Sequence, residues 1–190
     1  MLLLEAKHVN DDIEIRQLRE ADAQDLSACS VGYKGAAQIN EWWFADARDF
    51  ILEGLEKANR GEGLHAGVWY RGMLVGIVCV TLGQDSPAGK ADDSTARIDY
   101  GLMPAYRGKG IMTMACAALI DYSFRELPID CVEITPDVVN VKSCAIPERL
   151  DFRKERVIEN AVQYSRDLVG DLAIYVLSRA EWQAGLSRAL

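Results

Sequence analysis

Residues 96–113, ARIDYGLMPAYRGKGIMT, predict a strand, a short turn and a glycine-containing loop that opens a helix. Main-chain amides in the first turn of a helix have no partners inside it, and the peptide dipoles add partial positive charge there. Gly108 and Gly110 permit positive φ and let a ligand approach the backbone. Arg107 and Lys109 supply full positive charges. We therefore interpret this segment as a phosphate-binding loop.

The loop differs from two other phosphate-binding motifs. A Walker loop needs G-x-x-x-x-G-K-[ST], but here Lys109 is followed by Gly110, which has no hydroxyl for magnesium. The dinucleotide fingerprint G-x-G-x-x-G fails because Thr113 occupies the position of the third glycine. A basic, glycine-containing turn before an ordinary helix is the alternative that the loop alone leaves open.

The composition bounds the class of protein. With 190 residues, 49% of them hydrophobic, the chain can bury one substantial core, so we expect a single domain spanning residues 1–190. The 21 Lys and Arg against 29 Asp and Glu give a net charge of −8, so no nucleic-acid partner is expected. The apolar run at residues 2–4 is too short for a signal peptide or a membrane span, so no membrane partner is expected either.

Cysteine and histidine usage argues against a metal site. The five cysteines are odd in number and widely spaced, which is typical of reduced thiols in a cytoplasmic protein and not of a disulfide framework. His8 and His65 are the two histidines, and neither lies near a cysteine or in an H-x-x-x-H pattern. We expect a cytoplasmic protein without a bound metal.

The order of elements indicates a mixed α/β fold with a largely antiparallel front half. Arg71 and Gly72 predict a two-residue hairpin turn, and the polar residues 84–95 predict a loop. Trp42, Trp43 and Phe44 form an aromatic cluster that we interpret either as core packing or as the wall of a substrate site. Hydrophobic periodicity predicts strands at residues 12–18, 66–70, 73–83, 96–103, 131–135, 151–162 and 171–178, and helices at 19–26, 45–60, 111–126 and 143–150.

Five stretches carry a resemblance to a known family: EIRQLREADAQDL, GVWYRGMLVGIV, IDYGLMPAYRGKGIMTMA, NVKSCAIPERLDF and DLAIYVLSRAEW. The chain resembles the GNAT superfamily of acyl-CoA-dependent N-acetyltransferases, specifically the RimJ/RimL branch that acetylates ribosomal-protein N-termini. The resemblance implies a three-layer fold with a mixed sheet of about seven strands, helices on both faces, and acetyl-CoA as cofactor. The sheet would splay around the coenzyme between the strands at 96–103 and 131–136.

The resemblance also assigns roles to residues of the site. Asn140 should bind the pantetheine arm, and Ser143 should lie near the thioester sulfur, with Tyr175 or water as the other proton source for the leaving thiolate. Arg149 is a candidate for the adenosine 3′-phosphate. As residue types, Asn140 and Ser143 are equally good helix N-caps, and Pro147 fits the first turn of a helix that starts near Ser143. The backbone near Leu102 and Met103 should bind the pantetheine, and the pyrophosphate should lie on the amides of Arg107, Gly108, Lys109, Gly110, Ile111, Met112 and Thr113.

The chain departs from the family at the general base. Some RimL-type enzymes use a glutamate where our alignment places Gln163, and glutamine cannot accept a proton at neutral pH. Asp99, Glu133 or an ordered water are the remaining candidates for the base, and Asp99 is alternatively a solvated strand carboxylate. Asp151 stands where the family often has glycine, so we expect a left-handed backbone there.

Three functions follow from the resemblance. The first is acetylation of a protein N-terminal α-amine, and the second is acetylation of a small amine such as a polyamine or an amino sugar. The third is a non-catalytic acyl-CoA-binding module, which Gln163 motivates. The acceptor side would be built from residues 30–45 and 84–95, which do not identify the amine. A homodimer is left open as the oligomeric state.

Overall fold

The structure of the chain is a computed structural model that describes residues 2–31, 46–83, 94–165 and 168–188. The chain divides into two compact units, one of Met1–Thr81 and Tyr100–Leu119 and the other of Leu82–Asp99 and Ile120–Leu190. Strand β5 (Thr95–Leu102) and helix α3 (Ile111–Glu126) contribute residues to both units. The aromatic cluster at residues 42–44 and most of the loop predicted at 84–95 lie outside the described residues.

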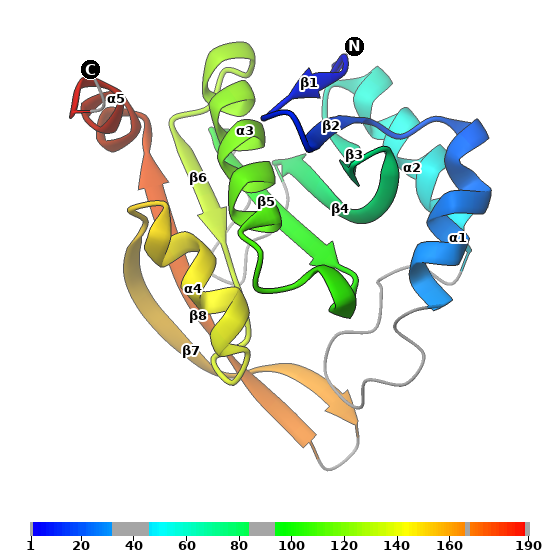
Figure 1. Ribbon diagram of the computed structural model, residues 1–190. Coiled ribbons are helices and arrows are strands. Elements are labelled where there is room, and N and C mark those ends of the chain that lie inside the picture. The colour runs from blue at the N-terminus through cyan, green and yellow to red at the C-terminus, as the bar shows by residue number, and fades with distance from the viewer. Residues whose placement is uncertain (1, 32–45, 84–93, 166–167, 189–190) are drawn as a thin grey trace. The chain divides into compact units, whose positions relative to one another are not determined.

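In the first unit, four strands follow one another in the order β1-β2-β3-β4, each antiparallel to its neighbour where its pairing is given (Figure 1). They are β1 (Lys7–His8), β2 (Ile13–Gln17), β3 (Gly63–Tyr70) and β4 (Met73–Leu82). The carboxyl end of β5 continues this arrangement, because the Met103 amide donates to the Val75 carbonyl at 2.9 Å. The strands predicted in this part are confirmed, and β1 is an additional short strand.

The turn between β3 and β4 has the conformation that the sequence predicts. Arg71 and Gly72 both have positive φ, 52° and 77°. Two central residues with positive φ define the tight hairpin turn whose twist matches the flanking strands. The turn therefore fixes the register in which Tyr70 opposes Met73.

Helix α2 (Ala47–Arg60) starts two residues later than predicted because Asp46 is its N-cap. The Asp46 carboxylate accepts hydrogen bonds from the amides of Arg48 and Asp49 at 2.8 and 3.0 Å. The helix ends, as predicted, at Gly61, which has a φ of 77°. The preceding helical run consists of the short 3-10 helix η1 (Glu20–Asp22) and helix α1 (Ala23–Val31).

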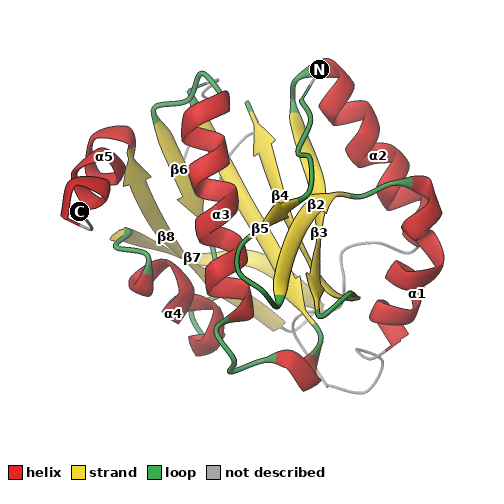
Figure 2. Cartoon of the chain, turned by 45° about the horizontal axis from the view of Figure 1, so that its top comes forward, coloured by secondary structure: helices red, strands yellow, loops and turns green. Residues whose placement is uncertain are grey.

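Helices cover both faces of the sheet in the first unit (Figure 2). On one face, Ile77 and Cys79 of β4 belong to a buried cluster with Phe50 and Ile51 of α2. Gly76 points the other way, since side chains alternate along a strand. A Cβ at Gly76 would lie 3.3 Å from Met112 Cε of α3 and 2.5 Å from the Gly101 carbonyl oxygen. Only glycine therefore lets β4 and β5 approach this closely.

In the second unit, the sheet runs in the order β5-β6-β8-β7. Its further elements are β6 (Cys131–Ile134), α4 (Val141–Arg149), β7 (Arg153–Ser165), β8 (Leu168–Ser178) and α5 (Arg179–Arg188). Strands β5 and β6 are parallel over only three pairs, from Thr95↔Cys131 to Arg97↔Glu133, although β5 runs on to Leu102. In the described residues the parallel register thus ends where the predicted splay should begin.

Helix α5 was not predicted, although its sequence signal is present. The Ser178 amide donates to the Glu181 carboxylate at 2.8 Å, and the Glu181 amide donates to the Ser178 hydroxyl at 3.2 Å. This reciprocal pair is a capping box, for which S-x-x-E is the signature. The described residues contain eight strands, against about seven expected, and none of their helices is long and apolar enough to cross a membrane.

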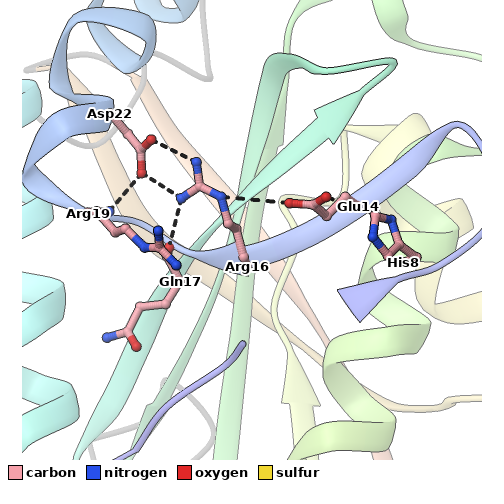
Figure 3. Close-up of polar contacts among 6 residues, drawn as sticks. All are labelled: His8, Glu14, Arg16, Gln17, Arg19 and Asp22. Atoms are coloured by element: carbon pink, nitrogen blue, oxygen red, sulfur yellow. Dashed lines mark hydrogen bonds and ion pairs between the residues drawn. The ribbon is translucent and has the colours of Figure 1, made fainter. Parts of the chain in front are cut away.

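A partly buried ion pair joins Arg16 of β2 to Asp22 at the end of η1 (Figure 3). The Arg16 guanidinium donates to both oxygens of Asp22 at 2.7 and 2.8 Å, and it lies 3.7 Å from the centroid of the Trp69 ring. The Arg19 amide also donates to Asp22, at 2.8 Å. Burial raises the pKa of Asp22, but the bonds and charges of Arg16 and Arg19 outweigh it, so the pKa is lowered overall.

The lowered pKa of Asp22 predicts an acid-sensitive contribution to stability. The contribution is present above the unfolded-state pKa, about 3.9, and is lost as the pH falls through the folded-state pKa. Asp22→Asn should therefore lower the free energy of unfolding at pH 7, by an amount that shrinks below about pH 4. Urea unfolding of both proteins at several pH values measures this, and a difference that stays constant with pH would contradict it.

Gly76→Ala should destabilise the protein by about 1–3 kcal/mol, because the new methyl group would overlap the Gly101 carbonyl, a backbone atom that cannot rotate away. Gly185→Ala in α5 is the matched control, since a Cβ there meets no atom within 4 Å. In a helix this control should be neutral or stabilising by up to about 1 kcal/mol. Thermal and urea unfolding compare the two, and equal stabilities would show that the close approach of β4 to β5 is unimportant.

Candidate functional site

The predicted phosphate loop lies in the first unit between a short 3-10 helix, η2 (Pro104–Tyr106), and α3. Gly108 and Gly110 have φ values of 77° and 75°, so both glycines adopt the left-handed conformation that the sequence suggested. The Met114 amide donates to the Gly110 carbonyl at 3.0 Å, which is the first hydrogen bond of the helix. The amides of residues 111–113 precede that bond and remain for an anion.

Helix α3 is held firmly at this end. Ile111 and Met112 are 1% and 5% exposed, and Ala115 and Cys116 are fully buried. These four positions do not lie on a single stripe of the helix, so the helix is buried on more than one side. A helix packed on several sides cannot slide or rotate easily, so its free amides are fixed in position before a ligand arrives.

Two backbone groups assigned to the coenzyme already have partners within the first unit. The Arg107 amide donates to the Pro104 carbonyl at 3.2 Å, and the Met103 amide donates to the Val75 carbonyl at 2.9 Å. The Arg107 side chain turns back to the end of β5, where Nε donates to the Leu102 carbonyl at 3.1 Å. The amides that remain for a phosphate are therefore those of residues 108–113.

In the second unit, Asn140 is the N-cap of α4. Its Oδ1 accepts from the Ser143 amide at 3.2 Å, and its carbonyl accepts from the amides of Ser143 and Cys144 at 2.9 and 3.0 Å. The predicted helix start near Ser143 is thus wrong by two residues, and Ser143 is not the N-cap. Pro147 consequently lies inside the helix and not in its first turn.

The cap position of Asn140 is compatible with a second role. Capping uses the side-chain oxygen, so the side-chain NH₂ group keeps its two donors. A donor at this position suits an amide carbonyl of a pantetheine arm. Ser143, held by the same cap in the first turn of α4, lies where the helix dipole favours negative charge.

Tyr175 of β8 is buried, and Cys144 of α4 is half-buried. Tyr175 is 1% exposed, and its hydroxyl donates to Glu148 Oε1 at 2.8 Å. Burial and this hydrogen bond raise the pKa of Tyr175, so the hydroxyl stays protonated. The Cys144 thiol donates to the Asp137 carbonyl at 3.4 Å, and burial raises its pKa too. A thiol in this state is a poor nucleophile.

The carboxylates considered as bases lie on one face of the sheet in the second unit. Asp99 Oδ2 accepts from Arg97 Nε at 3.1 Å, an ion pair that proton transfer would have to disturb. Glu133 is only 4% exposed and stands opposite Arg97 in the register of β5 and β6. Sequence reasoning missed Arg97, although two residues of spacing along a strand place it on the same face as Asp99. Gln163 lies exposed on β7.

Asp151 has a φ of 60°, the left-handed conformation expected for it. Within the described ranges, His, Cys, Asp and Glu side chains form no group of three that could hold a metal ion.

Comparisons with known proteins agree with this geometry. A model of the acetyltransferase (GNAT) domain matches residues 12–153. The chain is 32% identical over 184 residues to a Bacillus subtilis (strain 168) protein named "Putative ribosomal N-acetyltransferase YdaF", with 92% of this chain and 96% of that protein covered.

Solved structures are similar over almost the whole chain. A crystal structure of a probable acetyltransferase has a TM-score of 0.79 at 31% identity and covers 94% of this chain and 99% of its own. RimL, a ribosomal L7/L12 α-N-protein acetyltransferase solved with coenzyme A, has a TM-score of 0.79 at 20% identity and covers 92% of this chain and 98% of its own. The predicted mixed α/β fold of the GNAT type is confirmed.

Replacing Asn140 and Ser143 tests which of them caps α4. Asn140→Ala should cost about 1 kcal/mol of stability through the lost cap, whereas Asn140→Asp should cap as well as asparagine but lose the side-chain donors. Ser143→Ala should leave stability nearly unchanged, since Ser143 is not the cap. Urea unfolding of the three variants measures this. A loss for Ser143→Ala as large as that for Asn140→Ala would contradict the cap assignment.

Proposed function

The chain belongs to the acetyltransferase (GNAT) family, and from this premise we propose that it transfers the acetyl group of acetyl-CoA to a protein N-terminal α-amine. The observation that carries the proposal is the loop at residues 108–113, where positive φ at Gly108 and Gly110 presents unpaired amides at the start of α3. The likeness to a protein named for ribosomal N-acetylation extends over 92% of the chain and supports the choice of acceptor.

Acetyl-CoA fits the residues present in each unit. The amides of residues 108–113 and the exposed Lys109 would hold the pyrophosphate, and the Leu102–Met103 segment would lie along the pantetheine. The Asn140 side-chain NH₂ would donate to an amide carbonyl of the pantetheine, while its Oδ1 keeps the cap of α4. Bound acetyl-CoA supplies an activated acetyl group as a thioester.

Ser143 and Asp99 are the proposed catalytic residues. In the transfer, a bond forms between the amine nitrogen and the acetyl carbon, the carbon–sulfur bond breaks, one proton leaves the amine and the thiolate is released. The Ser143 hydroxyl would donate a hydrogen bond to the developing thiolate, with the dipole of α4 adding to its stabilisation. Asp99 would accept the proton directly or through water, with the Arg97 ion pair loosened as it does so.

We propose further properties on separate grounds. The family match at residues 12–153 includes parts of both units, which supports one acyltransferase domain over residues 1–190. All five cysteines are free thiols, three of them buried, which supports a cytoplasmic location. A homodimer remains our proposal for the oligomeric state, and the net charge of −8 supports a partner other than nucleic acid.

The proposal is tested with labelled acetyl-CoA and matched acceptors. Peptides with a free α-amine and no lysine should be acetylated, whereas the same peptides with a blocked N-terminus should not. Faster labelling of polyamines or amino sugars would make the enzyme a small-amine acetyltransferase. Binding of coenzyme A without labelling of any acceptor or hydrolysis would indicate a non-catalytic module.

Ser143→Ala tests the mechanism. If the hydroxyl stabilises the thiolate, kcat should fall by about ten- to a thousandfold with little change in the KM for acetyl-CoA, since a transition-state hydrogen bond is lost. The melting temperature should hold, because Asn140 supplies the cap. Unchanged kcat would remove Ser143 from the mechanism and leave the proton to water or Tyr175.

A further inference from the structure

Two tyrosines from separate segments of the first unit meet beside the phosphate loop. Tyr70 ends β3 and Tyr106 ends η2, and their ring centroids lie 5.9 Å apart with the rings edge to face at 67°. The Tyr106 hydroxyl donates to Met73 Sδ, the first residue of β4, at 3.1 Å. The β3–β4 hairpin is therefore attached to the segment that leads into the loop.

Lys109, between the two glycines of the loop, lies against both rings. Its Nζ is 5.2 Å from the centroid of Tyr106 and 6.0 Å from that of Tyr70, within the range of a cation–π interaction. No carboxylate among the described residues forms an ion pair with it. The neighbouring cations differ, since Arg71 pairs with Asp12 at 2.9 Å and Arg107 donates to the Leu102 carbonyl.

We propose that Tyr70 and Tyr106 are positioning residues that hold the Lys109 ammonium at the loop, where it binds a phosphate of coenzyme A. The inference rests on the proposed function, because it assumes that the loop binds this coenzyme. A lysine side chain loses rotamer freedom when it binds a phosphate. The two rings restrict that freedom before the ligand arrives, so less affinity is lost on binding.

The arrangement favours this role over stacking with the adenine base. The ammonium group already lies within interaction range of both rings, so a base that stacked on them would have to displace it. Cation–π attraction leaves the charge of the ammonium intact, unlike an ion pair with a carboxylate. Lys109 is thus a cation of this loop that is restrained by neutral partners and still able to neutralise a phosphate.

The test is a double-mutant cycle read by calorimetric titration of coenzyme A, which needs no knowledge of the acceptor. Tyr106→Leu and Tyr70→Leu should each raise the Kd for coenzyme A about two- to fivefold, the size expected from an exposed cation–π contact. Tyr106→Phe and Tyr70→Phe keep the rings and should retain the wild-type Kd. In a Lys109→Met background, the leucine substitutions should cause no further rise.

The controls separate this inference from the proposed function. Lys57→Met removes an equal charge from α2, where Glu53 pairs with Lys57 at 2.7 Å, and should leave the Kd unchanged. No binding by the wild-type protein would overturn the proposed function itself. Binding by the wild type with unchanged Kd in the leucine variants, or an equal rise in the Lys109→Met background, would overturn the positioning role alone. If Tyr70→Leu impairs folding, the double-mutant cycle of Tyr106→Leu with Lys109→Met tests the positioning role.

Discussion

Backbone amides at the start of a helix cannot be paired within that helix, and the first unit is built around this constraint at α3. Left-handed φ at Gly108 and Gly110 turns the chain into α3 at the segment of residues 108–113, whose amides we propose bind the coenzyme phosphates. The buried side chains of Ile111 and Met112 fix the helix in place. On the strand side, Gly76 allows β4 to lie against the Gly101 carbonyl and so fixes the end of β5 that precedes the loop. The packing of the sheet and of the helix thus fixes both ends of the segment that carries the amides of residues 108–113. An exposed loop can be preorganised in this way.

Much of the fold could be predicted because its signals are local. Helix α2 is bounded by a cap at Asp46 and a left-handed Gly61, and the β3–β4 hairpin by Arg71 and Gly72. Helix α5 carries an equally local signal in the capping box of Ser178 and Glu181. This helix could therefore have been predicted from the sequence. Strand β1 is different, because two residues are too few for a periodic pattern, and only its pairing with β2 defines it. Helix α2 and the β3–β4 hairpin were thus predictable because local cap and turn motifs mark their ends.

The roles of the site residues stay predictions, and their hydrogen bonds were only partly predictable from the sequence. Asn140 and Ser143 are both good caps, and the turn that precedes the helix selects Asn140. In that turn the Asp137 carboxylate accepts a hydrogen bond from the Val139 amide, and the Asp137 carbonyl accepts one from the Asn140 amide. Asp137 in turn is bridged to Leu172 of β8, a contact distant in sequence. The amides of Met103 and Arg107 were assigned to the coenzyme, yet β4 and η2 already engage them. Such competition between partners depends on tertiary pairing, which no local pattern contains.

The ionisable groups of the second unit bear on the choice of acceptor. Gln163 cannot take a proton, Asp99 is held by Arg97, and Glu133 is buried, so none is a strong, freely exposed base. An enzyme with weak base assistance depends on amines that are already neutral. At pH 7 roughly one in ten protein α-amines is neutral, given a pKa of about 7.7–8.0, against about one in 2,500 lysine ε-amines with a pKa of about 10.4. The difference of more than about a hundredfold favours an N-terminal acceptor over an ordinary alkylamine. With glutamine at position 163, we expect the proposed reaction to favour acceptors of low pKa, and the protein N-terminus is such an acceptor.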